Sequence, residues 1–180
     1  MARACLYRRA LGPAYSGQSS AGQLVHEAGT SRWTGSCTVD GAETMMARFV
    51  SALFRLPEAT DGASITVDFL ADDDGEIWTR RIGQRAMRSR QFIVAGKPAG
   101  WIVERFGVFD FDLELEVADR RLRLMLRGVR CCGLPLPRLL WPLIEASESE
   151  NEEGRFCFDV RIDVPFAGRL VRYHGWLTDR

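Results

Sequence analysis

The chain has 180 residues, of which 46% are hydrophobic and 27% charged, and its formal net charge is zero. This length and composition fit one globular domain, so we expect residues 1–180 to form a single domain. The balanced charge argues against a nucleic-acid-binding protein, which needs a net basic face. Lys97 is the only lysine, so any lysine-dependent chemistry would have to use this residue.

The five cysteines indicate a reducing compartment. Their number is odd, they form no C-x-x-C motif, and the adjacent pair Cys131-Cys132 suits neither a disulfide nor a zinc site. Met1–Arg9 lacks the apolar core of a secretory signal. No apolar run approaches the roughly 18 residues of a membrane-spanning helix. We therefore expect a cytoplasmic protein with reduced thiols and no transmembrane segment.

Helical patterns are confined to the first third of the chain. Residues 6–28 predict one or two short helical pieces, and residues 33–39 a first strand. From residue 42 to 56, apolar side chains recur at steps of three and four, which predicts an amphipathic helix that Pro57 ends. We interpret its methionine and phenylalanine stripe as core packing rather than a cofactor site; the stripe comprises Met45, Met46, Phe49, Val50, Leu53 and Phe54.

From residue 63 onward the pattern is that of β-strands. Ile65, Val67 and Phe69 alternate with polar residues, and Asp73-Asp74-Gly75 predicts a turn before the strand over 76–82. This turn does not match a calcium loop, because Leu70 and Arg81 would occupy positions that need oxygen ligands. Further strands are expected at 86–94 and 101–106, with a bend at Gly107.

The clearest hairpin turns at Asp119-Arg120. Apolar residues from Phe109 to Val117 alternate with acidic ones, and the returning strand alternates leucines with arginines. A two-residue turn makes paired residue numbers sum to 239, and a slip by one residue would turn carboxylates into the core. The predicted pairs are Val117–Leu122, Leu115–Leu124 and Leu113–Leu126 on one face, and Glu116–Arg123 and Asp112–Arg127 on the other, which we interpret as the solvated back of the sheet.

The last third of the chain predicts a crossing segment, a loop and two strands. Prolines exclude a central strand over 131–142. The acidic residues from Glu145 to Glu153 predict a solvated loop, and strands follow at 156–164 and 170–177. Overall we expect an α+β fold that is mainly antiparallel β. About eight strands in meander order would form a barrel or a strongly curved sheet around a central cavity.

Several blocks, taken in order, resemble a known family. They are Leu6–Tyr15, Glu76–Arg80 with Ser89, Glu104–Gly107, Gly133–Pro137, and Gly154–Phe156 with Tyr173–Leu177. Together they resemble the bacterial family catalogued as domain of unknown function 4166, over nearly the whole chain. The resemblance implies no established activity and no catalytic set. Similar domains occur alone or fused to oxidoreductase-like or epimerase-like proteins, which implies an accessory or ligand-handling role with such a partner protein.

The candidate site is a group of five residues that are all predicted on strands: Trp78, Arg80, Ser89, Glu104 and Tyr173. Of these, Trp78 and Arg80 share one face with Ile82 by parity. If Arg80 faces inward, it needs a partner, for which Glu104 is the candidate. The pair would then either fix the barrel interior or anchor a ligand in an apolar pocket. The histidines, His26 and His174, are expected to be structural, and no cluster has the spacing of a metal site. We expect no cofactor.

Three functions remain open at this stage. The first is a non-catalytic module that binds a small hydrophobic ligand in an apolar cavity. The second is a small enzyme with Glu104 as general acid and base, which requires this carboxylate to face an open cavity. The third is a protein-interaction domain, which an exposed apolar patch around Leu139, Leu140 and Trp141 would favour.

Overall fold

The structure is a computed structural model that describes residues 5–72 and 74–179. Its helical elements are α1 (Leu6–Leu11), η1 (Gly12–Gly17), α2 (Ser20–Glu27), α3 (Met45–Leu53) and η2 (Arg138–Leu140). Its strands are β1 (Ser31–Asp40), β2 (Thr60–Ala71), β3 (Gly75–Ile82), β4 (Arg85–Phe92), β5 (Trp101–Phe106), β6 (Phe109–Ala118), β7 (Arg121–Cys131), β8 (Leu134–Pro135), β9 (Leu143–Glu150), β10 (Phe156–Val164) and β11 (Gly168–Asp179).

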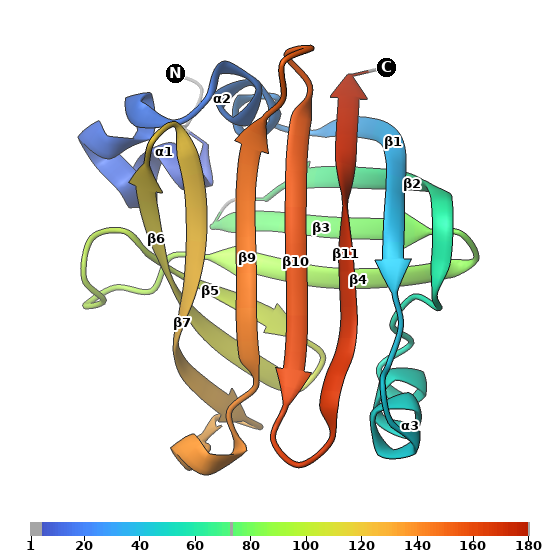
Figure 1. Cartoon of the computed structure of the whole chain (residues 1–180). Helices are drawn as coiled ribbons and strands as arrows, with labels where there is room; N and C mark the ends of the chain where they lie inside the picture. Colours follow the sequence, from blue (N-terminus) through green and yellow to red (C-terminus); the bar gives the residue numbers. More distant parts are fainter. Residues whose placement is uncertain (1–4, 73, 180) are drawn as a thin grey trace.

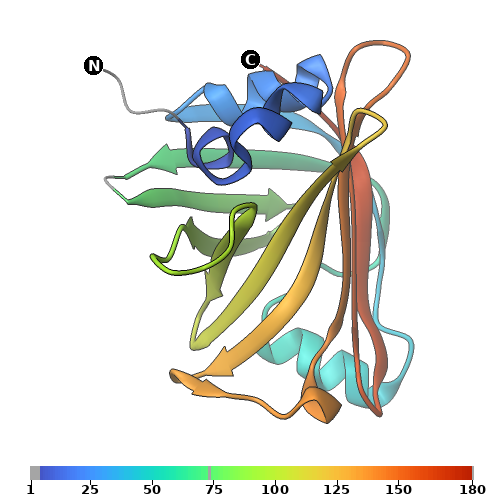
Figure 2. The ribbon, with the colours of Figure 1, turned by 90° about the vertical axis from the view of Figure 1, so that its left-hand side faces the viewer.

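The strands close into an antiparallel barrel. Hydrogen-bonded neighbours follow the order β6-β5-β4-β3-β2-β1-β11-β10-β9-β7, and β6 pairs with β7 to complete the ring, while the short β8 extends β7. In Figure 1, β9, β10 and β11 run up the front and β3 and β4 cross behind them. The helices α1 and α2 lie at one end and α3 at the other, as Figure 2 also shows. The expected antiparallel barrel is therefore confirmed, with ten strands rather than about eight.

The predicted hairpin is present with its two-residue turn. Asp119 and Arg120 both have positive φ angles, 51° and 60°, the conformation of the turn that suits tightly paired strands. All three apolar pairs and the Glu116–Arg123 pair are confirmed. The backbone carbonyl of Arg120 also accepts a hydrogen bond of 3.0 Å from the amide of Ser19, so the turn holds the segment that leads into α2.

One predicted pair of the hairpin is wrong. A register shift between Asp112 and Leu113 places Asp112 opposite Gly128 instead of Arg127. Gly128 makes this arrangement possible, because a Cβ atom there would lie 2.6 Å from Oδ2 of Asp112. The alternation carries a sign of this irregularity, because the inward apolar residues of β7 are even-numbered up to Leu126 and odd-numbered from Val129.

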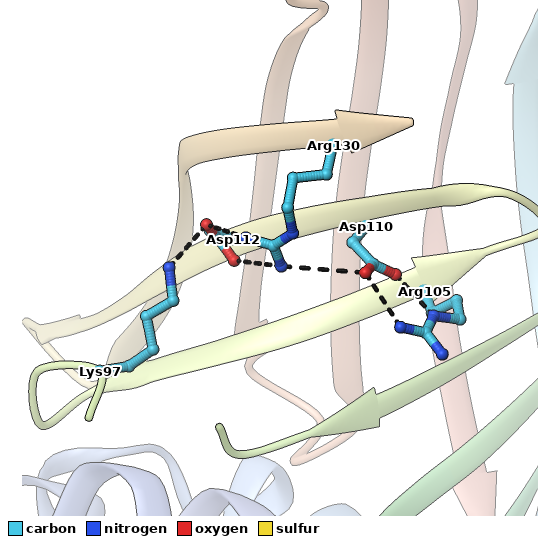
Figure 3. A network of polar contacts seen from close by, with 5 residues as sticks. All are labelled: Lys97, Arg105, Asp110, Asp112 and Arg130. Atoms are coloured by element: carbon cyan, nitrogen blue, oxygen red, sulfur yellow. Dashed lines mark hydrogen bonds and ion pairs between the residues drawn. The ribbon is translucent and has the colours of Figure 1, made fainter. Parts of the chain in front are cut away.

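The bulge brings two carboxylates into a network with three cations on the outer face of the barrel (Figure 3). Asp112 accepts hydrogen bonds from Lys97 (2.8 Å) and Arg130 (3.0 and 3.1 Å), and Asp110 accepts from Arg105 (2.6 and 3.0 Å). Both carboxylates are buried beneath these side chains. This part of the outer face is therefore not a solvated row of charges, and Lys97 is bound in the network.

Two further expectations need correction. The acidic segment taken for a loop is largely strand β9, in which Ile144 and Ala146, on either side of Glu145, face the barrel interior. The predicted helix is shorter, Met45–Leu53, and four of its six stripe residues are exposed rather than in the core. Val50 and Phe54 alone line the interior, because hydrophobic spacing defines an apolar face without showing which part of it is covered.

The N-terminal helical segment, the strands expected over 33–39, 65–69, 76–82, 86–94, 101–106, 156–164 and 170–177, and the bend at Gly107 are present. Of the expected turn at residues 73–75, Asp73 lies outside the described residues, as do residues 1–4 of the opening segment. Across the described chain, no helix has the length and apolar character needed to cross a membrane.

The backbone of the hairpin turn predicts a stabilising change. Replacing Arg120 by Gly removes the steric cost of its positive φ and should raise the free energy of unfolding by about 0.5–1 kcal/mol. The matched control is Arg121→Gly, one residue later in extended β7, which should lower it by about 0.5–1 kcal/mol. Urea denaturation monitored by tryptophan fluorescence measures both, and a loss of stability in Arg120→Gly would contradict the turn geometry.

The ion pair of Asp110 predicts a pH-dependent change in stability. The hydrogen bonds from Arg105 hold the pKa of Asp110 below its usual value, against the opposing effect of burial. The pair therefore stabilises the fold above the unfolded-state pKa of about 4 and loses this effect as the pH falls through the lowered folded-state pKa.

Replacing Arg105 by Gln should accordingly cost about 0.5–1 kcal/mol at neutral pH, a small effect because Arg105 is half exposed. The cost should shrink as the pH is lowered from neutral to about pH 2, because protonation of Asp110 removes the ion pair. Urea titrations at both pH values test this, with Arg123→Gln as the control, since no ion pair of Arg123 is found within the described residues. An equal cost at both pH values would contradict the assignment.

Candidate functional site

The barrel encloses a cavity of about 340 Å³. Most of its lining comes from the inward-facing residues of the alternating strands, such as Phe111 and Leu113 of β6 and Phe158 and Val160 of β10. Because successive side chains of a strand point to opposite faces, the same alternation that places charges outside gives the cavity an apolar wall. The volume lies within the range of about 300–1,000 Å³ that is typical of sites for small molecules.

The wall has one polar region, and it contains the predicted residues. Nη1 of Arg80 donates to Oγ of Ser89 at 3.0 Å, and both terminal nitrogens of Arg80 lie 3.4 Å from Oε1 of Glu104. The guanidinium carbon of Arg80 is 4.7 Å from the ring centre of Trp78. The structure thus brings Trp78, Arg80, Ser89 and Glu104 together from three neighbouring strands, β3, β4 and β5.

Arg80 keeps its charge inside the barrel. Desolvation by burial acts to lower its pKa, but the field of Glu104, with smaller contributions from Tyr173, Tyr7 and Glu148, more than offsets this, and the pKa is raised. The distances to Glu104 exceed the roughly 2.7–2.9 Å of a strong charge-assisted hydrogen bond. The pair is therefore loose, and both groups keep capacity for a further hydrogen bond toward the cavity.

Tyr173 is the fifth predicted residue and also lines the cavity. Burial, with the nearby carboxylate of Glu104, raises the pKa of its phenol despite the opposing effect of Arg80, so the hydroxyl stays neutral. Within residues 5–72 and 74–179, this hydroxyl has no hydrogen-bond partner. A neutral donor and acceptor thus faces the same space as the loose Arg80–Glu104 pair.

Helices α1 and α2 cover one end of the barrel, and a second polar cluster lies where they meet the wall of the cavity. The hydroxyl of Tyr7 in α1 donates to Oε1 of Gln91 at 2.8 Å, and Nε2 of His26 in α2 lies 2.8 Å from Oε2 of Glu148. The rings of Tyr7 and His26 stack with centres 3.7 Å apart. Burial, followed by the charge of Glu148, raises the pKa of Tyr7 well above its ordinary value, so this hydroxyl also remains a neutral donor.

Glu76 connects the closing helix to the site. It accepts hydrogen bonds of 3.1 Å from the backbone amide of Leu6 and from Nε1 of Trp78, whose ring covers Arg80. The positions of the aromatic ring and the guanidinium are therefore coupled to the docking of α1. Helices α1 and α2 close the cavity at the end where its polar groups lie.

Sequence reasoning missed several residues of this end. Glu76 and Gln91 could have been found, because they share the inward parity of Trp78 and Ser89 on their own strands. Glu148 was hidden by the interpretation of its segment as a loop. Tyr7 and His26 carried no signal, since their partners are 84 and 122 residues away in the chain.

The described residues include no cluster of three or more metal-ligating side chains. All five cysteines are free. Burial raises the pKa of the buried thiol of Cys37 to about 11, which keeps it protonated and unreactive. The polar region of the cavity is accordingly a set of hydrogen-bonding groups without a nucleophilic thiolate.

The loose ion pair predicts a particular result in a double-mutant cycle. Arg80→Met alone should lower the free energy of unfolding by about 1–3 kcal/mol, because Glu104 is left without its cation. In the double variant Arg80→Met/Glu104→Leu, the free energy of unfolding should return to within about 1 kcal/mol of the parent value, since two apolar side chains suit the rest of the wall. Chemical denaturation of the four proteins gives the coupling energy, and additive losses would show that the two side chains do not interact.

Comparison with known proteins gives a family but no activity. A search of curated proteins finds no match. A crystal structure of a protein of unknown function from the DUF3598 family of Nostoc punctiforme is similar, with 12% sequence identity and a TM-score of 0.47. The match covers 84% of this chain and 47% of that one, so this chain spans about half of its length.

The family model described as domain of unknown function (DUF4166) matches residues 23–177. This range takes in every strand of the barrel and α3, together with most of α2. The chain therefore belongs to the DUF4166 family.

Proposed function

We propose that this domain binds a small, mainly apolar ligand inside the barrel, with the ligand's polar end against Arg80, Glu104 and Tyr173. The observation that carries the proposal is the combination of an apolar cavity of about 340 Å³ with a group of incompletely bonded polar side chains in its wall. Apolar walls supply most of the binding free energy at such sites, and a few polar groups orient the ligand. Trp78 and Ser89 hold Arg80 in place from the side.

The charges of the site favour a neutral head group. A carboxylate would be attracted by Arg80 and repelled by Glu104. An ammonium group would be repelled by Arg80 and attracted by Glu104. A hydroxyl or carbonyl can accept from Arg80 or Tyr173, and a hydroxyl can also donate to Glu104, without an unpaired charge being buried. We therefore infer an alcohol, ketone or similar neutral polar end on a hydrocarbon body.

Fluorescence of N-phenylnaphthylamine, a neutral apolar dye that brightens in apolar sites, provides the test. Dye bound by the purified protein should be displaced by dodecanol at a lower concentration than by dodecanoate or dodecylamine. Ala146→Phe, which fills part of the cavity from β9, should reduce dye binding about tenfold or more, because it removes the space that the dye occupies.

Glu145→Phe is the matched control, because it adds the same ring to the neighbouring, exposed position of β9 and should leave dye binding unchanged. Equal loss in both variants would attribute the effect to the fold rather than to the cavity. Absence of dye binding by the parent protein, together with native mass spectra that show no bound molecule, would overturn the proposal.

A catalytic role for Glu104 is the second candidate, because its carboxylate lines the cavity. The ion pair with Arg80 would hold such a carboxylate in position for proton transfer. Glu104→Gln separates the two functions, since it keeps the shape of the side chain. Chemical conversion of a bound ligand that this variant abolishes would favour an enzyme, and unchanged ligand recovered from both proteins would favour binding alone.

A further inference from the structure

Helix α3 exposes an apolar face. The exposed fractions of Met45, Met46, Phe49 and Leu53 are 78%, 59%, 73% and 70%. These residues lie on one side of the helix, because they are spaced by one, three and four residues. Four large apolar side chains on one exposed helical face are unusual for a protein surface and mark a site of interaction.

The orientation of α3 is fixed by its other side. Oγ1 of Thr44 caps the helix and donates to the carbonyl of Ala167 at 2.7 Å, and Oγ of Ser51 donates to the carbonyl of Leu170 at 2.9 Å. Ala47 is fully buried against the barrel. The helix therefore cannot roll to cover its apolar face without breaking these contacts with the start of β11.

More exposed apolar side chains lie at the same end of the barrel. Phe166, in the turn between β10 and β11, is 79% exposed, and Leu139 and Leu140 of η2 are 69% and 52% exposed. Both views place α3, η2 and this turn at the end opposite α1 and α2 (Figures 1 and 2). We call these seven side chains, four from α3 and three from the other segments, the apolar rim.

The apolar rim is continuous with the cavity. Val50 lines the cavity from the helix that carries four rim residues, and Phe54 lines it from the position directly after that helix. Leu140 belongs to both, since it lines the cavity and is half exposed. The opposite end is sealed by Tyr7 and His26, so this end is where the apolar interior reaches the surface.

Basic side chains stand beside the rim. Arg48 and Arg55 flank the exposed face of α3, and Arg138 lies on η2 over the ring of Trp141. In the described part of the chain, no carboxylate forms an ion pair with any of the three. They are free to meet negative charge from outside.

The nearby carboxylates do not cancel this positive charge. Glu43, before the helix, pairs with Arg169 at 3.3 Å, and Glu58, after it, pairs with Arg85 at 2.6 Å. Within the described residues, Arg48, Arg55 and Arg138 thus leave three cations without an ion pair at this end, against the two carboxylates of Asp40 and Asp61, where β1 ends and β2 begins. Exposed apolar side chains bordered by arginines are complementary to anionic lipid head groups above an acyl layer.

We propose that the apolar rim docks on the surface of an anionic lipid bilayer, with the exposed face of α3 inserted among the head groups and Arg48, Arg55 and Arg138 against the phosphates. Docking in this orientation turns the mouth of the cavity toward the acyl chains. In this last respect the inference rests on the proposed ligand-binding function, although docking itself needs no bound ligand.

Flotation with phospholipid vesicles tests the proposal. The full chain should float with vesicles of phosphatidylcholine that contain phosphatidylglycerol, and much less with phosphatidylcholine alone. Phe49→Glu with Leu53→Glu should abolish flotation. Arg48→Gln and Arg55→Gln should each weaken binding to the anionic vesicles about fivefold, the effect expected of one basic residue near such a surface.

Leu24→Glu is the matched control, because Leu24 is 56% exposed on α2 at the sealed end. It should float as the parent does. Circular dichroism and dye binding without vesicles should be unchanged in the Phe49→Glu/Leu53→Glu variant, which separates failure of docking from failure of the cavity. A parent chain that does not float, or a rim variant that floats as well as the parent, would overturn the proposal. So would sedimentation showing that the rim holds two copies of the chain together instead.

Discussion

Pairing between β6 and β7 is the contact on which the rest of the structure depends. Without it the sheet would end in two free edges, and the interior would be an open groove. The hairpin strands are held in register by leucine pairs inside and by the two-residue turn, while the bulge at Asp112 is held outside by Lys97 and Arg130. The network around Asp110 and Asp112 thus lies where β6 pairs with β7, and its charges serve the fold.

Closure also explains why the interior divides into two regions. Strands β6 and β10 alternate and present aromatic and aliphatic side chains, whereas the inward positions of β3 to β5 include Glu76, Arg80 and Glu104. These polar groups would be costly in a dry interior, and each is matched by another, directly or through Trp78 and Ser89. The matching is incomplete at the cavity surface, where Tyr173 and the loose side of the Arg80–Glu104 pair lie, and at the closing helices, where Nδ1 of His26 has no partner among the described residues.

The sequence predicted what depends on local alternation and on parity. The hairpin register, the shared face of Trp78 and Arg80, and the antiparallel fold follow from patterns of period two. The bulge opposite Asp112 was not predicted, although the inward apolar residues of β7 change from even to odd numbers between Leu126 and Val129. The inward position of Glu148 was not predicted, because its strand carries acidic residues on both faces. Tyr7 and His26 meet the site only through the docking of α1 and α2, a long-range contact without a local signature.

The two ends of the barrel differ in a way that connects the cavity with the surface. At one end, polar contacts of Tyr7, His26 and Leu6 join the closing helices to the wall, and a ligand could pass only if several hydrogen bonds broke together. At the other end, no comparable cluster joins Val50, Phe54 and Leu140, and their contacts are apolar and can be remade against a hydrocarbon chain. A ligand with an apolar body would therefore exchange through the end that bears the apolar rim and enter with its polar end first. The polar groups then lie at the blind end of the cavity, where they can select the head group of a molecule whose hydrocarbon body remains toward the mouth.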